Sequence, residues 1–262
     1  MKTVSLLFTF LLVVDAAVIQ GQVPRRAVSD EQIVAQGQRV GSGTYVEIYQ
    51  HGVTVDPSFL QSMESVYKQV ETVTGVKLDT ATLGPKVHLY VSDAVGVSHV
   101  WRGYQHPSDP RAIIFLNPRV YLGAMSGTNA THIHELAHLF TWRFTSHTLR
   151  EGLADAVALS ILPGAAVGPN PGGDEWPPDI PSEILAYLGT TKPPPGWLAT
   201  DRERRRAYYF ASRRFVSSLV ERKGMETFMK LYGSENPEIA IRSLYGISRE
   251  EAIQAALRGR PG

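Results

Sequence analysis

The sequence predicts an α+β fold, in which a small mixed β-sheet packs against helices and an all-helical C-terminal lobe follows. Three observations predict it. Strand-like and helix-like hydrophobic patterns alternate over residues 43–163. A Pro- and Gly-rich loop at 164–200 then interrupts the chain, and the patterns at 201–262 are helical only. With 262 residues, 43% of them hydrophobic, the chain can bury a full core as one two-lobed unit.

The N-terminal residues predict an export signal. Lys2 precedes an apolar run at 6–14, and small residues follow at 16–21. Because the run is short for a membrane-spanning helix, we expect 1–21 to be removed, leaving no stable membrane association. The protein is then secreted or periplasmic, and a polar N-terminal segment, 22–42, comes first in the mature chain. The sequence contains no cysteine, which excludes disulfides.

The first lobe is predicted as strand, helix, strand, strand and helix. Residues 44–48 alternate as in a half-buried strand. A helix starts at Asp56-Pro57, an N-cap followed by a first-turn proline, and runs to Gly75. Strands are expected at 87–91 and 112–116, the latter ending at an Asn-Pro pair.

Helices are predicted at 202–222, 225–232, 238–244 and 249–257. Asp201 is the expected cap of the first, and Ser248 with Glu251 forms a capping box for the last. The helix at 202–222 is amphipathic. Its expected buried stripe is Tyr208, Ser212, Phe215 and Leu219, and its opposite face carries Arg206, Arg213, Ser217 and Glu221.

The most informative motif is His134-Glu135-Leu136-Ala137-His138, within the largely apolar helical stretch 130–142. On an α-helix, residues four apart lie on nearly the same face, so both imidazoles can reach one ion, with Glu135 beside them. Two surface histidines around a surface glutamate would give the same pattern. A helix this apolar is largely buried, however, and buried imidazoles need partners such as a metal ion. We expect His134 and His138 to bind Zn²⁺.

A catalytic zinc needs a third protein ligand, and the next predicted helix, 148–159, offers Glu151. One turn later, Asp155 could accept the second ring N–H of a ligating histidine. Thr148 and Glu151 also match a capping box, which would need no metal. His147 is a rival third ligand, although its place in the turn makes it the weaker one. His132 is expected to be a packed or surface histidine.

The HExxH motif of the first helix, followed by Glu151-Gly152-Leu153-Ala154-Asp155, resembles the gluzincins, zinc metallopeptidases of the peptidase MA-like superfamily. The resemblance implies a zincin-like fold around the HExxH helix, with Glu151 as the third zinc ligand and an acidic partner one turn later. The helix containing Tyr209 is similar to the one that carries a transition-state tyrosine in aminopeptidase-like members. Local periodicity instead makes Tyr208 the core residue, and plain aromatic packing could explain both.

Two differences from known zinc peptidases limit which of them this chain resembles. Metzincins have Gly and a third His soon after the second His, where this chain has Thr141 and Phe144. The Gly-x-Met-Glu-Asn exopeptidase motif does not precede the zinc helix, so an aminopeptidase is not supported. By analogy with gluzincins, residues 113–116 would be the sheet's edge strand that pairs with an extended substrate. An ordinary inner strand is the equally favoured alternative.

The resemblance implies an exported zinc-dependent peptidase acting on peptides or proteins, with Glu135 as general base and Tyr209 at the oxyanion. The net charge of +1 gives no reason to expect nucleic acid as a partner, and no oligomeric state is predicted. One alternative is a catalytically silent zincin-like module for secreted binding or scaffolding. Another is a metal-independent helical scaffold in which Glu151 only caps its helix.

Overall fold

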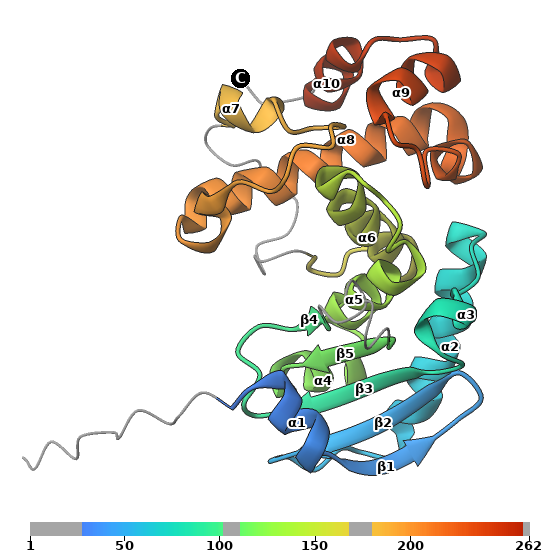
Figure 1. Ribbon diagram of the computed structural model, residues 1–262, viewed down its shortest axis with the longest axis vertical. Helices are drawn as coiled ribbons and strands as arrows, with labels where there is room; N and C mark the ends of the chain where they lie inside the picture. Colours follow the sequence, from blue (N-terminus) through green and yellow to red (C-terminus); the bar gives the residue numbers. More distant parts are fainter. Residues whose placement is uncertain (1–27, 102–110, 168–179, 259–262) are drawn as a thin grey trace, which may run out of the picture.

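The computed structural model describes residues 28–101, 111–167 and 180–258, and these form a mixed α+β fold (Figure 1). The strands are β1 (Gln38–Ser42), β2 (Val46–His51), β3 (Val87–Ser92), β4 (His99–Val100) and β5 (Ile113–Leu116). The helices are α1 (Asp30–Gln36), α2 (Ser58–Thr74), α3 (Thr80–Leu83), α4 (Pro118–Met125), α5 (Thr131–Phe140), α6 (His147–Ile161), α7 (Ser182–Leu185), the 3₁₀ turn η2 (Gly196–Ala199), α8 (Arg202–Met229), α9 (Pro237–Tyr245) and α10 (Arg249–Leu257).

The five strands form one mixed sheet in the order β1-β2-β3-β5-β4. The three central strands are parallel, with Ile48 paired to Leu89 and Leu89 to Ile114. The two outer strands run antiparallel to their neighbours. Alternation divides the side chains between the two faces, so Leu89 joins the main core while its neighbour Tyr90 belongs to a smaller cluster on the other face. The expectation of a small mixed sheet is confirmed.

The prediction that 113–116 forms the edge strand is wrong. β5 lies between β3 and β4, and all four of its residues are buried. The strand that covers it is only two residues long, with His99 paired to Phe115 and Val100 to Ile114. So short a strand has no periodicity of its own, so the hydrophobic pattern does not reveal it.

The segment 22–42 is not simply a polar stretch, because its described part contains α1 and β1. Ser29 and Gln32 form a capping box that starts α1. β1 is mostly exposed and pairs with β2 as an edge strand, so it lacks the buried alternation that identifies a strand in sequence. The predicted export signal, 1–21, lies outside the described residues. Among the helices that the structure describes, none has the length and apolar character needed to cross a bilayer.

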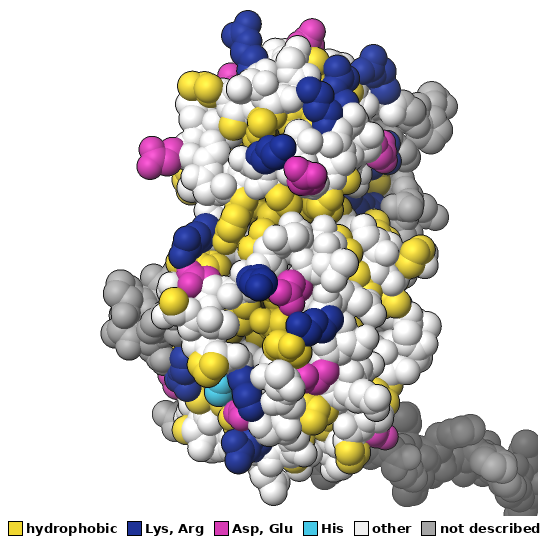
Figure 2. All heavy atoms as spheres, turned by 90° about the vertical axis from the view of Figure 1, so that its right-hand side faces the viewer, with side chains coloured by type: hydrophobic (Ala, Val, Ile, Leu, Met, Phe, Trp, Pro, Cys, Tyr) yellow, Lys and Arg dark blue, Asp and Glu magenta, His cyan; other side chains and the backbone are white. Residues whose placement is uncertain are grey.

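Helices cover both faces of the sheet, and the helical C-terminal part lies beyond α5 and α6 (Figure 1). The small helix α1 covers one face, where Ile33 packs with Tyr90 and Phe115. The helices α2 and α5 belong to the main core on the other face, and this core continues through α6 into α8, α9 and α10. Figure 2 shows hydrophobic side chains gathered on one face of the molecule in a band between its upper and lower parts. The sheet and the helical part therefore share one core.

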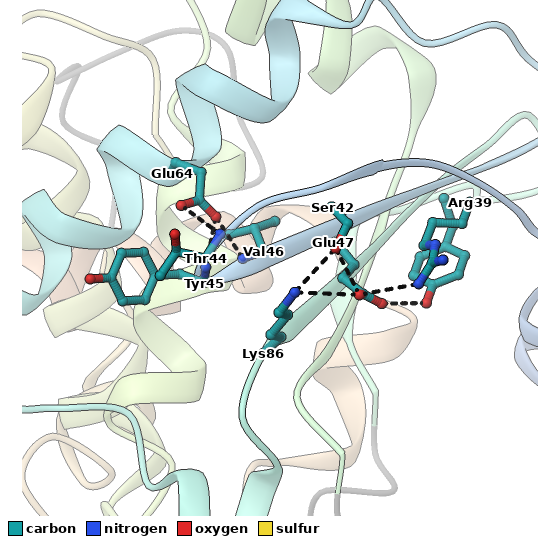
Figure 3. Close-up of polar contacts among 9 residues, drawn as sticks. Arg39, Ser42, Thr44, Tyr45, Val46, Glu47, Glu64 and Lys86 are labelled. Atoms are coloured by element: carbon teal, nitrogen blue, oxygen red, sulfur yellow. Dashed lines mark hydrogen bonds and ion pairs between the residues drawn. The ribbon is translucent and has the colours of Figure 1, made fainter.

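A carboxylate holds the β1–β2 turn against α2 (Figure 3). Glu64, on α2, accepts hydrogen bonds from the backbone N–H groups of Thr44, Tyr45 and Val46, at 3.2, 2.8 and 2.8 Å. A Cβ at Gly43 would lie 2.4 Å from the Glu64 carboxylate, so only glycine permits this close approach. The contact fixes the start of β2 over the helix that supports α5.

The predicted C-terminal helices are confirmed. Asp201 accepts from the Arg204 N–H at the start of α8, and Ser248 with Glu251 forms the capping box of α10. Gly224, with φ +79°, breaks α8 into the two predicted helices. The buried stripe is confirmed as well, but Arg213 is also buried, contrary to its predicted place on the exposed face. The predicted loop 164–200 contains α7 and η2.

Candidate metal centre

The centre is built on two consecutive helices, α5 and α6, which pack against each other. Asn129 precedes α5, and its side-chain oxygen accepts a hydrogen bond from the Thr131 N–H at 2.8 Å, although the N-cap position is Ala130, whose side chain makes no capping hydrogen bond. Every residue of α5 from His132 to Phe140 is buried. The motif of two histidines and a glutamate is therefore enclosed rather than displayed on the surface.

His134, His138 and Glu151 converge. The Nε2 atoms of the two histidines lie 3.5 and 3.4 Å from Oε2 of Glu151. Their rings are nearly perpendicular, at 88°, with centroids 4.6 Å apart. The three donor atoms all lie within 4.8 Å of one another, and all three side chains are buried.

These separations match ligands that share a small cation. Bonds of about 2.0–2.2 Å in a tetrahedral arrangement place neighbouring donor atoms about 3.4 Å apart. A charge-assisted hydrogen bond would instead bring nitrogen and oxygen to about 2.7–2.9 Å. His134 shows that difference directly, because its other nitrogen, Nδ1, lies 2.7 Å from Oδ1 of Asp155.

The contact with Asp155 also fixes which nitrogen of His134 carries the proton. An ionised carboxylate only accepts hydrogen bonds, so Nδ1 must donate, and a neutral ring then presents the lone pair of Nε2 toward Glu151. At 3.5 Å, Nε2 and Oε2 then need a positive charge between them, either a proton on the ring or a bound cation. A metal ion could supply that charge, and Asp155 is placed to orient His134 as the sequence suggested. Among the described residues, Nδ1 of His138 has no hydrogen-bond partner.

The electrostatics of the buried cluster couple the charges of its histidines and its glutamates. Burial alone would lower the pKa of His134, but Asp155 and Glu151 outweigh it and hold that pKa well above its usual value. Burial would raise the pKa of Glu151, but His138 and His134 hold it well below its usual value. Burial also raises the pKa of Glu135 to about 8. The pKa shifts of His134 and Glu151 show that a positive charge between them is favoured, and a divalent cation bound at their facing atoms could replace the proton there. The donor set therefore fits such an ion.

The interpretation of Glu151 as a helix cap is wrong. Ser146 is the N-cap of α6, and its side chain accepts from the Leu149 N–H. Thr148 is used elsewhere, since its hydroxyl donates to the Tyr187 carbonyl and accepts from the Gly189 N–H. Glu151 is thus left free to face the two histidines of α5.

His147 does not belong to the mutually close set of donors. It is the first residue of α6, and its Nε2 lies 3.4 Å from Oε1 of Glu151, whereas His134 and His138 contact this carboxylate at Oε2. Its Nδ1 lies 2.9 Å from the hydroxyl of Tyr208 on α8. His132 is 4% exposed and, as expected, packed inside the protein; its burial lowers its pKa to about 4.

Glu135 follows His134 directly on α5 and is 8% exposed. Within the part of the chain that the structure describes, its carboxylate has no hydrogen-bond or ion-pair partner. With its pKa raised to about 8 by burial, this group can exchange a proton with a neighbouring water near neutral pH.

The two tyrosines of α8 have different surroundings in the structure. Tyr208 is fully buried and its hydroxyl is tied to His147, so it is the core residue that the periodicity predicted. Tyr209 is half-buried and packs edge-on against Tyr208. The Glu151 carboxylate, burial and the Glu135 carboxylate together raise the pKa of Tyr209 far above its usual value, so its hydroxyl stays neutral near pH 7.

Gly152 allows α6 and α8 to approach closely, and sequence reasoning gave it no role. A Cβ at this position would lie 2.3 Å from the Ser212 carbonyl oxygen and 2.6 Å from a methyl group of Val216. The glycine directly after Glu151 therefore sets the distance from the metal ligands to the helix that carries Tyr209. A glycine inside an otherwise helical pattern is the signal that could have revealed it.

Comparisons with known proteins add no relative. No protein-family model matches the sequence, and no curated protein matches it either. What can be said of function thus rests on the residues and their geometry.

Proposed function

We propose that this protein is an exported zinc-dependent peptidase of the gluzincin type, with a zincin-like fold. The observation that carries the proposal is the convergence of His134, His138 and Glu151 at separations suited to one cation. Zinc is favoured because two imidazoles and one carboxylate, with a fourth position left for water, form a known type of catalytic zinc site.

A zinc ion held there would polarise a carbonyl and lower the pKa of a bound water toward about 7. The chain's own residues do the rest of the chemistry. Glu135 takes a proton from the attacking water and later delivers it to the leaving amine, as a general base and then a general acid. Asp155 keeps His134 in the tautomer that directs Nε2 toward the metal.

Tyr209 is proposed to donate a hydrogen bond to the oxyanion that develops during attack. Its hydroxyl stays neutral and therefore able to donate, because the neighbouring carboxylates oppose its ionisation. Within the described residues it has no hydrogen-bond partner that would compete with a substrate. Such a donor contributes about 3–4 kcal/mol to transition-state stabilisation.

The decisive experiment compares two variants of purified protein by elemental analysis and by cleavage of a mixed peptide library. Glu135→Gln should retain one zinc per chain and lose hydrolysis, whereas Glu151→Ala should lose the metal as well. Wild-type protein that binds zinc but cleaves nothing, with or without chelator, would instead identify a catalytically silent binding module. Unchanged zinc content in Glu151→Ala would remove Glu151 from the ligand set.

A further inference from the structure

The carboxylate of Glu151 is contacted from two sides, and only one side belongs to the metal centre described above. Oε2 faces Nε2 of His134 and of His138, at 3.5 and 3.4 Å. Oε1 faces Nε2 of His147 at 3.4 Å, one helical turn before Glu151 on α6. The two oxygens of one carboxylate therefore have separate partners.

His147 is itself held by a hydroxyl from another helix. Its Nδ1 lies 2.9 Å from the hydroxyl oxygen of Tyr208 on α8. Tyr208 is 0% exposed, and the rings of Tyr187 and Trp197 pack against it with centroids 6.1 and 6.0 Å away. A hydroxyl fixed in this way can hold the imidazole in one orientation.

The partners of the two nitrogens determine the tautomer of His147. Nδ1 lies 2.9 Å from the Tyr208 hydroxyl, and Nε2 faces the Glu151 carboxylate. A neutral imidazole has one N–H, and the carboxylate of Glu151 can only accept. The proton therefore resides on Nε2, facing Oε1, and Nδ1 accepts from the Tyr208 hydroxyl.

We propose that His147, fixed by Tyr208, is a positioning residue that restrains Glu151 so that Oε2 alone binds the cation. The separation of 3.4 Å is longer than a charge-assisted hydrogen bond, but the partial positive charge of the His147 N–H still attracts Oε1 and so favours keeping that oxygen away from the metal. Two imidazole nitrogens and one carboxylate oxygen then make three protein donors, and the fourth position stays open for water. Without this restraint Oε1 is free to rotate toward the metal and fill the open position. The inference rests on the metal centre proposed above.

The test uses Co²⁺ as a probe bound to the purified full-length protein, because visible absorption distinguishes four-coordinate from five-coordinate Co²⁺. The wild type should give the intense bands of a four-coordinate site. His147→Leu and Tyr208→Phe should both bind Co²⁺ with weaker, shifted bands, and the metal affinity of His147→Leu should fall about 10-fold. His147→Gln, whose amide N–H can replace Nε2–H, should restore the wild-type spectrum. His88→Leu, on the sheet, is a matched control that should leave the spectrum unchanged.

The outcomes separate this inference from the proposed function. If the wild type binds no Co²⁺ or Zn²⁺, the metal centre itself is wrong. If the wild type binds the metal but His147→Leu and Tyr208→Phe both keep the wild-type spectrum, the positioning role is overturned and the metal centre stands. Tyr208→Phe removes a single oxygen, so it provides the same test should His147→Leu fail to fold. If His147→Gln gives the same weakened Co²⁺ bands as His147→Leu, the proposed contact between the side-chain N–H and Oε1 of Glu151 is also wrong.

Discussion

Gly152→Ala should disturb the metal centre through a single added methyl group. The new Cβ would lie 2.3 Å from the Ser212 carbonyl oxygen, and ordinary contact begins at 3.4 Å. α6 and α8 must therefore separate by about 1 Å at this point, because the obstacle is helix backbone and cannot rotate away. The displaced residue stands next to Glu151, so its carboxylate shifts relative to His134 and His138.

The magnitude follows from two opposing contributions. Overpacking a buried contact costs about 1–3 kcal/mol. Alanine offsets up to about 1 kcal/mol of this because it favours a helix interior over glycine. With the middle of the first range, the net loss of unfolding free energy should be about 1 kcal/mol, which lowers Tm by about 2–4 °C for a domain of this size. The shift of Glu151 should weaken zinc binding about 10-fold.

The assay is thermal unfolding followed by circular dichroism, together with zinc affinity measured by competition with a chromophoric chelator. Gly196→Ala is the matched control, because no atom lies within 4 Å of its added Cβ and its backbone is unstrained. That control should be neutral or slightly stabilising. If Gly152→Ala behaves like Gly196→Ala in both measurements, the reasoning about helix spacing is refuted.

Four further outcomes are expected. Asp155→Ala should lower zinc affinity about 10–100-fold by releasing the ring of His134, and unchanged affinity in the chelator competition would contradict the orienting role. Tyr209→Phe should reduce kcat about 100-fold with KM and zinc content unchanged; a rise in KM alone would indicate ground-state binding instead. Glu64→Ala should lower the free energy of unfolding by about 1–3 kcal/mol, because the turn N–H groups lose their acceptor, while zinc content should not change. An unchanged urea midpoint would contradict this prediction. Removing the metal with a chelator should lower Tm, with recovery on adding Zn²⁺; equal melting with and without metal would show that the folded state gains nothing from the ion.

Most of the helices and the central strands were predictable because each has a strong local signal. The alternating residues of β2 and β3, the amphipathic α2 and the capping box of α10 are examples. β1 and β4 were missed because their backbones are ordered by pairing with neighbours rather than by a buried pattern of their own. The same cause made the edge-strand prediction for β5 wrong, since two residues of β4 are enough to cover it.

The candidate site was predictable where its residues lie close together in the sequence. The spacing of His134 and His138 follows from the helical repeat, and a short loop brings Glu151 within reach. The tie between His147 and Tyr208 was not predictable, because it joins residues far apart in the chain and depends on how α8 crosses α6. Periodicity did distinguish the buried Tyr208 from its half-buried neighbour Tyr209.

The three metal donors all come from one helix–loop–helix segment, whereas the two tyrosines come from a helix much later in the chain. Bringing ends together across a short loop costs little entropy, so we expect a refolding chain to capture the ion before α8 docks. Stopped-flow mixing with a zinc-sensitive dye would show this as metal uptake that precedes burial of the tryptophans. The α5–α6 segment would then form first, and α8 would pack onto it afterwards. The residues that bind the ion and the tyrosine that acts on the transition state would thus come from separate parts of the sequence.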